Sequence, residues 1–285
     1  QKERIKTNVI MVSTMTTRDA DVTILAMERG AVDFVTKPTN IIEAKGDAFR
    51  KEILGILNAV LKTERISLTE RRPAVAAVSA VQKRNASAET RFKNKIVALA
   101  CSTGGPKALQ SVIPYLPANL DAPMVLVQHM PAGFTNSMAN RLDEISKINV
   151  KEAENGEILK KGTVYIAPGG KHMEVKKCPD GSHKIVYNDM PPIGGLKPCA
   201  NITYDSLRTC GYDQVVCVVL TGMGADGTNG ILELSKVKPI YTIAQDAQTC
   251  VVYGMPKAIA ETGLVNEVVP LTEVANSITK NVGVN

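Results

Sequence analysis

The hydrophobic positions after residue 92 form short continuous runs that alternate with segments of helical spacing. Runs of strand length occur at 96–101, 124–128, 163–167, 215–220 and 240–244. Helical spacing follows the first two runs, at 106–115 and 135–146. Continuous apolar runs are typical of strands buried on both faces, and their alternation with helices is typical of parallel sheets. The pattern therefore predicts an α/β fold with a mostly parallel, doubly wound sheet and helices on both faces.

Residues 171–187 depart from this alternation. Two short runs of alternating polar and apolar residues flank Pro179-Asp180-Gly181-Ser182, which is a typical turn sequence. The segment predicts a β-hairpin inserted at the edge of the sheet. It contains His172 and His183, two of the three histidines, and we expect both at solvated or rim positions.

The first 92 residues carry a separate pattern. Strand-like runs at 8–14 and 32–36 alternate with helical spacing at 19–29 and with a helical stripe that ends at Leu61. From 62 to 92 the periodicity fades into Ala, Val, Ser, Arg and Lys, which is typical of a linker, and a partly helical linker is left open. This organisation predicts part of a first domain at 1–61, a basic linker at 62–92 and a complete domain at 93–285.

Composition and charge narrow the possible partners. The chain of 285 residues is 44% hydrophobic and 22% charged, which excludes disorder of the whole chain. Its net charge of +6 raises the question of a nucleic-acid partner. Residues 1–92 hold 16 of the 34 Lys and Arg residues and 11 of the 28 Asp and Glu residues, which leaves 18 against 17 in the rest. The domain at 93–285 is nearly neutral, so we expect no nucleic-acid partner.

The sequence also bears on compartment and cofactors. No apolar run approaches the ~20 residues of a membrane span, and the first six residues lack the apolar core of a signal peptide. The six cysteines are scattered and show no metal-ligand spacing. We therefore expect a cytoplasmic protein with reduced thiols, no insertion into a membrane, and neither a metal nor another cofactor.

Three polar residues directly follow predicted strands: Ser102, His129 and, after a short turn, Asp226. Taken singly, they suit a helix cap, a partly buried loop histidine and a turn residue. The carboxyl ends of parallel strands, however, meet at one edge of a sheet, where open α/β sheets bind their ligands. A hydroxyl nucleophile needs a base, and the base needs a carboxylate to orient it. Their joint placement predicts a catalytic triad.

Two glycine-rich turns accompany the triad. The segments 102–106 and 221–227 bring backbone amides to the same edge, where the amides can stabilise an oxyanion. Neither turn is a dinucleotide fingerprint or a P-loop, which makes a nucleotide site the weaker interpretation. Ser102 also lacks a Gly-x-Ser-x-Gly elbow, and the order Ser, His, Asp differs from that of the α/β-hydrolases. A non-enzymatic signalling module that binds receptor or nucleotide stays open as the alternative, whereas no helix-turn-helix pattern supports a DNA-binding regulator.

At these residues the sequence resembles the CheB family of chemotaxis receptor methylesterases. The matching segments are 100–106, 128–131, 165–173, 221–227, 244–246 and 250–256, in order along the chain. The resemblance implies a serine hydrolase that removes methyl groups from glutamyl esters of methyl-accepting receptors and also deamidates receptor glutamines. It implies Ser102 as the nucleophile, His129 as the base and Asp226 as its orienting carboxylate, with an oxyanion and substrate site at Thr103, Gly104 and Met223.

Two features depart from the family pattern. Lys197 and Cys199 stand where the family has Arg and Ser, and a lysine cannot form a bidentate guanidinium clamp on the substrate. Residues 8–38 resemble only the second half of a flavodoxin-like receiver domain, with Ser13 and Lys37 at its conserved hydroxyl and lysine positions.

The receiver resemblance implies regulation by the chemotaxis histidine kinase in the intact protein, with the receiver covering the active-site edge until it is phosphorylated. Only twelve residues precede Ser13, which is too few for the strand that carries a phosphoacceptor aspartate. We therefore expect a truncated receiver and little activation of this chain by phosphodonors.

Overall fold

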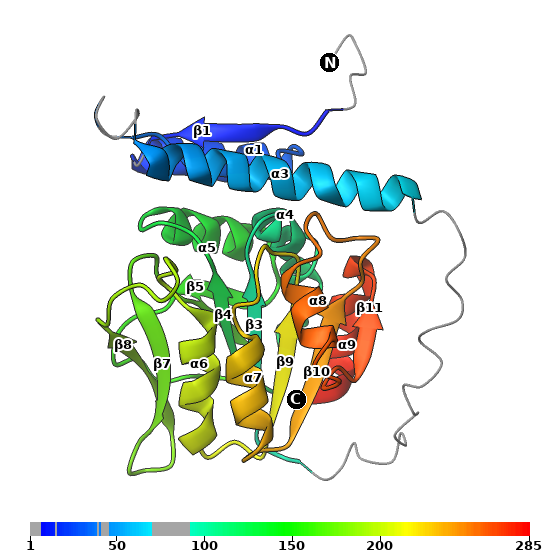
Figure 1. Cartoon of the computed structure of the whole chain (residues 1–285). Coiled ribbons are helices and arrows are strands. Elements are labelled where there is room, and N and C mark those ends of the chain that lie inside the picture. Colours follow the sequence, from blue (N-terminus) through cyan, green and yellow to red (C-terminus); the bar gives the residue numbers. More distant parts are fainter. Residues whose placement is uncertain (1–6, 15, 39, 41–45, 70–91) are drawn as a thin grey trace.

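The computed structural model describes residues 7–14, 16–38, 40, 46–69 and 92–285. Within this described part, no helix combines the length and the apolar character that a bilayer crossing requires. Two hydrophobic cores lie on opposite faces of one central sheet, and a smaller N-terminal unit lies at one end of that sheet (Figure 1).

The central sheet has seven strands in the order β11-β10-β9-β3-β4-β6-β5, and every neighbouring pair is parallel. The strands are β3 (Lys95–Cys101), β4 (Met124–Gln128), β5 (Asn149–Glu152), β6 (Thr163–Ile166), β9 (Gln214–Val219), β10 (Ile240–Gln245) and β11 (Glu267–Val269). The chain moves from β3 to β4 on one side and later enters β9 on the other side of β3. The strand order therefore reverses at the centre of the sheet, which is where such sheets form a ligand crevice.

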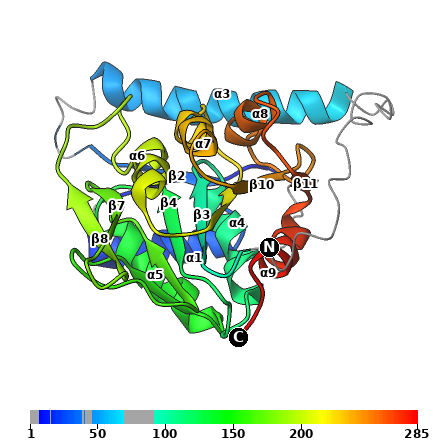
Figure 2. The ribbon, with the colours of Figure 1, turned by 90° about the horizontal axis from the view of Figure 1, so that it is seen from below.

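Helices cover both faces of the sheet, as the sequence predicts (Figure 2). One face carries α4 (Gly105–Gln110), α5 (Phe134–Ile145) and α9 (Val274–Val282), and the other carries α6 (Ala200–Ser206), α7 (Thr228–Ser235) and α8 (Met255–Ala260). Single 3-10 turns lie at Ile113–Tyr115, Leu207–Thr209 and Leu271–Glu273. Successive residues of β3 enter opposite cores, Leu99 on the α4 face and Ala98 on the α6 face. This alternation explains the unbroken apolar runs.

Two details differ from the predicted pattern. The helix predicted over 106–115 ends at Gln110 and resumes as a 3-10 turn around Pro114, which has no N–H for an α-helical hydrogen bond. The sequence pattern also missed β5 and β11. Both are short edge strands that contain polar residues and pair on one side only, so they lack the continuous apolar run of the inner strands.

The hairpin is confirmed, with β7 (His172–Lys177) antiparallel to β8 (His183–Asn188). It forms a sheet of its own that packs on α6, and it is not an edge of the central sheet as predicted. The expectation for the two histidines was wrong, because His172 is 0% and His183 is 5% exposed. His183 stacks on the Tyr212 ring and accepts a hydrogen bond from the Gly211 amide at 2.8 Å, and these contacts compensate for its burial.

The N-terminal unit consists of β1 (Ile10–Ser13), α1 (Thr17–Glu28), β2 (Asp33–Thr36) and α3 (Asp47–Thr69). β1 and β2 are parallel, and the amide of Lys37 donates to the carbonyl of Ser13, so both resemblance positions lie at the same strand ends. The helix α3 continues eight residues past its predicted end at Leu61. The remainder of the predicted linker, 70–91, lies outside the described residues.

The N-terminal unit packs directly on the larger domain through α1, which contacts α4 and α5. The rings of Phe34 and Phe134 stack with their centroids 4.5 Å apart, and both side chains belong to the main core. At the edge of this contact, the Arg141 guanidinium pairs with the Glu28 carboxylate at 2.9 Å. The two units therefore share one hydrophobic core.

We expect Phe34→Ala to lower the free energy of unfolding by about 3 kcal/mol, because it removes a buried ring from the shared core. The matched control is Val22→Ala in α1, whose side chain is 54% exposed and whose loss should cost less than about 0.5 kcal/mol. Urea unfolding of both variants measures the difference. Equal unfolding free energies for the two variants would mean that the units do not share a core.

Candidate active site

The three residues that follow the central strands meet at one end of the sheet. The register pairs Cys101 of β3 with Gln128 of β4, which places Ser102 beside His129. Ser102 also donates its amide hydrogen to the carbonyl of Thr221, just beyond β9, at 3.0 Å. The topology thus brings the predicted nucleophile, base and carboxylate to the crevice where the strand order reverses.

His129 and Asp226 form a buried pair. The Nε2 atom of His129 lies 2.8 Å from Oδ2 of Asp226, and both side chains are more than nine-tenths buried. Burial alone would raise the pKa of Asp226, but hydrogen bonds from the His129 ring and the Ala200 amide outweigh it and hold the pKa at about 2. The carboxylate is therefore ionised at neutral pH.

The ionised carboxylate fixes the tautomer of His129. Since Asp226 can only accept, Nε2 of His129 must carry the proton. Its Nδ1 atom is then a lone-pair acceptor, and it is buried without a hydrogen-bond partner among the described residues. This atom is available to take the Ser102 proton. The hydrogen bond between Ser102 and His129 is not formed in the structure, and such catalytic contacts commonly tighten only when substrate binds.

Four further donors hold Asp226. The backbone amides of Ala200, Asn201 and Gly227 donate to its oxygens at 2.6, 3.1 and 2.9 Å. The Cys199 thiol donates to Oδ1 at 3.1 Å. Burial and the adjacent carboxylate raise the pKa of this thiol to about 12, so it stays protonated and acts as a donor. The departure from the family pattern at Cys199 therefore leaves Asp226 with its hydrogen bond.

Gln128 joins the backbones of the nucleophile and the base. Its Nε2 donates to the carbonyls of both Ser102 and His129 at 3.1 Å, and its Oε1 accepts from the Cys101 thiol at 3.0 Å. A side chain on Gly105 would overlap this amide, which explains why a glycine stands there. Sequence reasoning gave Gln128 no role, although a polar residue at the end of an apolar strand was the available clue.

The predicted oxyanion residues line the two turns beside Ser102. Gly104 adopts a φ of 77°, which favours glycine, and is the N-cap residue of α4. Among the described residues, the amides of Thr103 and Met223 donate to no protein acceptor. A side chain on Gly222 would overlap Ser102 and Met255, so only glycine allows this close approach of the turns. The arrangement leaves two amide hydrogens near the serine for a developing negative charge.

Not all of the predicted residues belong to this cluster. Ser13 and Lys37 lie in the N-terminal unit, and Lys197 donates to the carbonyl of Asp189 in the loop after β8. Met223 is 48% exposed, and its methyl group lies 3.8 Å from the position that a side chain on Gly55 of α3 would take. The helix α3 of the N-terminal unit therefore lies beside the oxyanion turn.

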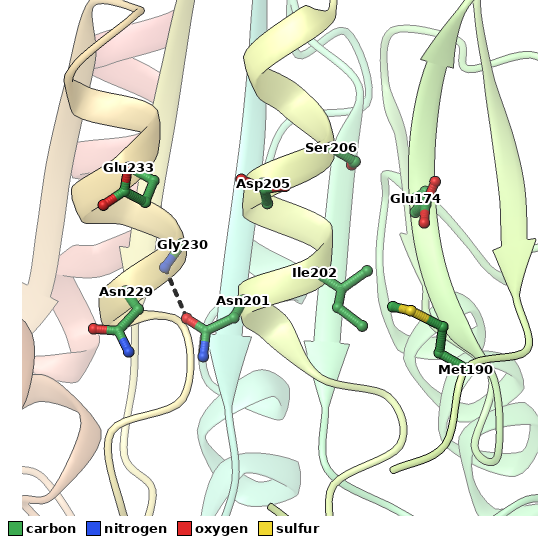
Figure 3. A pocket seen from close by; sticks show the side chains of 9 residues that line it. All are labelled: Glu174, Met190, Asn201, Ile202, Asp205, Ser206, Asn229, Gly230 and Glu233. Carbon is green, nitrogen blue, oxygen red and sulfur yellow. Dashed lines mark hydrogen bonds between the residues drawn. The ribbon is translucent and has the colours of Figure 1, made fainter. Parts of the chain in front are cut away.

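A pocket of about 370 Å³ is lined by residues of α6, α7 and β7 (Figure 3). Its wall includes Asn201, Ile202 and Gly230, and Figure 3 shows the Gly230 amide donating to Asn201, at 2.8 Å. None of the triad residues lines it. Asn201 contributes to both the pocket and the proposed triad. Its side chain lines the pocket, and its backbone amide donates to the Asp226 carboxylate. Across the described part of the chain, no group of three His, Cys, Asp or Glu side chains is placed to hold a metal ion.

Comparison with known proteins gives consistent results. The sequence model of the CheB methylesterase family matches residues 97–278. Two proteins named protein-glutamate methylesterase/protein-glutamine glutaminase are similar along nearly the whole chain. The protein of Symbiobacterium thermophilum is 40% identical over 98% of this chain and 78% of its own length. The protein of Geobacillus kaustophilus is 42% identical over 96% of this chain and 77% of its own length.

A solved structure agrees with these relatives. The crystal structure of the Thermotoga maritima CheB methylesterase catalytic domain superposes with a TM-score of 0.62 and 42% sequence identity. The superposition covers 65% of this chain and 97% of the Thermotoga domain. The α/β fold with its mostly parallel sheet is therefore the fold of that catalytic domain.

The depressed pKa of Asp226 makes stability depend on pH in a defined direction. A carboxyl with a pKa of about 2 in the folded state and about 4 when unfolded stabilises the fold above pH 4, and this contribution is lost as the pH falls towards 2. Between pH 5 and pH 3, we expect wild type to lose about 1 kcal/mol more unfolding free energy than Asp226→Asn. Urea titrations at both pH values measure this difference, and parallel losses would contradict an ionised Asp226.

Proposed function

This chain belongs to the CheB methylesterase family, and on that premise we propose that Ser102, His129 and Asp226 carry its catalysis. The activities are those named for its relatives, protein-glutamate methylesterase and protein-glutamine glutaminase. The substrates are glutamyl methyl esters and glutamines of chemotaxis receptors, and the enzyme acts in the cytoplasm. The observation that carries the proposal is the buried His129–Asp226 pair, which leaves one unpaired acceptor on the ring next to Ser102.

The geometry supports a two-step acyl transfer. Ser102 Oγ passes its proton to Nδ1 of His129 and attacks the carbonyl carbon of the side-chain ester or amide. The amides of Thr103 and Met223 stabilise the oxyanion of the tetrahedral intermediate. His129 then returns the proton to the leaving group, which departs as methanol or ammonia. Water attacks the acyl-Ser102 ester with the same histidine as base, which regenerates the serine and releases a glutamate side chain.

The negative charge of Asp226 is suited to its role in these steps. His129 becomes an imidazolium after it takes the serine proton, and a carboxylate 2.8 Å away stabilises that charge in a site with little water. A non-enzymatic signalling module would have no need for a buried, ionised carboxylate behind a histidine. The names of the relatives likewise favour the enzyme over that alternative.

We also propose that residues 1–61 are the C-terminal part of a receiver domain that covers the active-site edge. The parallel pair β1 and β2, with Ser13 and Lys37 at the strand ends, supports this assignment. The helix α3 supports the covering role, because its Gly55 lies beside Met223 and because Val251, which follows β10, packs into its apolar cluster. Where the receiver is complete, the chemotaxis histidine kinase is the expected regulatory partner.

We expect Ser102→Ala to abolish methanol release from a peptide that contains a glutamyl γ-methyl ester, because no other hydroxyl occupies the nucleophile position. The matched control is Ser111→Ala, at the end of α4, whose hydroxyl donates to the carbonyl of Lys107. This control should keep the wild-type rate. Methanol release by Ser102→Ala at the wild-type rate would show that the proposed nucleophile is wrong.

The covering role of α3 predicts a variant that is more active than wild type. Ile56 is 7% exposed and packs in the cluster that includes Val251, so Ile56→Ser should loosen α3 and raise methyl ester hydrolysis several-fold. The adjacent Leu57 is 40% exposed, and Leu57→Ser should leave the rate unchanged. Steady-state kinetics of both variants with the same ester peptide make the comparison. An unchanged or lower rate for Ile56→Ser would contradict the covering role.

A further inference from the structure

His172 is a buried histidine that the proposed acyl transfer does not use. It is the first residue of β7, its side chain is 0% exposed, and it comes from the hairpin rather than from the central sheet. Burying an imidazole is costly unless both ring nitrogens have partners, and here both do. Those partners connect it to the triad.

The hydrogen bonds of His172 define its protonation state. Its Nδ1 accepts from the backbone amide of Cys199 at 3.2 Å, and its Nε2 lies 3.1 Å from the carbonyl oxygen of Pro191. An amide only donates and a carbonyl only accepts, so Nδ1 is unprotonated and Nε2 carries the hydrogen. The neutral ring therefore closes the loop between Pro191 and Cys199 by bonding to both of its ends.

Cys199, whose amide donates to His172, is the first of three consecutive residues that donate hydrogen bonds to Asp226. These donors are the Cys199 thiol and the amides of Ala200 and Asn201, at the start of α6. The seven-residue helix α6 is short, and such a helix relies on tertiary contacts to fix its position. A second tie, from the Thr203 hydroxyl to the carbonyl of Met173, also joins α6 to β7.

We propose that His172 is a positioning residue for catalysis. Its Nδ1 fixes the backbone of Cys199, so that Cys199, Ala200 and Asn201 together hold the Asp226 carboxylate against Nε2 of His129. This inference rests on the proposed function, because it assigns His172 an effect that passes through Asp226. The proposal assigns His172 no contact with the substrate or with the reacting atoms.

Two substitutions of His172 separate its two hydrogen bonds. In His172→Asn the amide oxygen lies near the Nδ1 position and can accept from Cys199, whereas the bond to Pro191 is lost. In His172→Gln the longer side chain places its amide nitrogen near the Nε2 position, where it can donate to Pro191, whereas the bond from Cys199 is lost. Both variants remove the same ring, so each is a control for the packing effect of the other.

We expect His172→Gln to lower kcat for methyl ester hydrolysis about tenfold with KM unchanged, the effect of one lost orienting hydrogen bond. His172→Asn should stay within about twofold of wild type. The two substitutions are repeated in an Asp226→Asn background. There His172→Gln should not lower kcat further, because the effects of substitutions in residues that act as one unit are not additive. Equal losses in both His172 variants, or the same tenfold loss in the Asp226→Asn background, would overturn the proposal.

The result with Asp226→Asn alone separates the two claims. Wild-type activity in that variant would contradict the proposed triad itself, and with it any role for His172 through Asp226. A large loss there keeps the triad, and the His172 series then decides the further inference. If a variant does not fold, a measurement on the wild-type chain still tests the proposal. The ¹⁵N shifts of His172 at neutral pH should identify the neutral ring with hydrogen on Nε2, and a protonated Nδ1 would overturn the proposal.

Discussion

The structure depends most on one buried, ionised carboxylate, that of Asp226. Removing such a group from water costs several kcal/mol unless hydrogen bonds and an opposite or polarisable partner replace the lost solvation. Here the thiol of Cys199, the amides of Ala200, Asn201 and Gly227, and the ring of His129 supply that replacement. These donors come from three separate segments of the chain. The same charge decides which nitrogen of His129 carries hydrogen, and therefore which nitrogen is left to accept a proton.

The central sheet makes this arrangement possible because its strand order reverses at β3. Ser102 and His129 leave neighbouring strands at the same level, and the side-chain amide of Gln128 bonds to both backbones. The turn after β9 reaches them from the other side, where Gly222 permits close contact with Ser102. Rigid strand ends thus position Ser102 and His129, whereas loops and the short helix α6 position the Asp226 carboxylate. The helix α3 of the N-terminal unit lies across the same end of the molecule (Figure 1).

The sequence predicted the features that local pattern determines. Continuous apolar runs identified every inner strand, and the polar residues after three of them indicated the proposed triad, which the structure brings to one end of the sheet. The sequence pattern did not predict edge strands such as β5. A strand that pairs on one side only can contain polar residues, so it has no continuous run of apolar residues. The sequence also did not predict that His172 is buried. Its burial depends on hydrogen bonds to Pro191 and Cys199, and only the folded chain brings these residues to the ring. The fading periodicity after Leu61 did not show where the helix ends, and the structure continues α3 to Thr69.

The central claim is that substrate acylates Ser102, with His129 as the base and Asp226 as the carboxylate that orients it. The most direct measurement is mass spectrometry of the enzyme quenched in acid within milliseconds of mixing with a glutamyl γ-methyl ester peptide. The account predicts an enzyme mass increased by that of the peptide minus methanol, with the added mass located on the fragment that contains Ser102. An acyl group on a different residue, or turnover with no covalent species at any quench time, would contradict it.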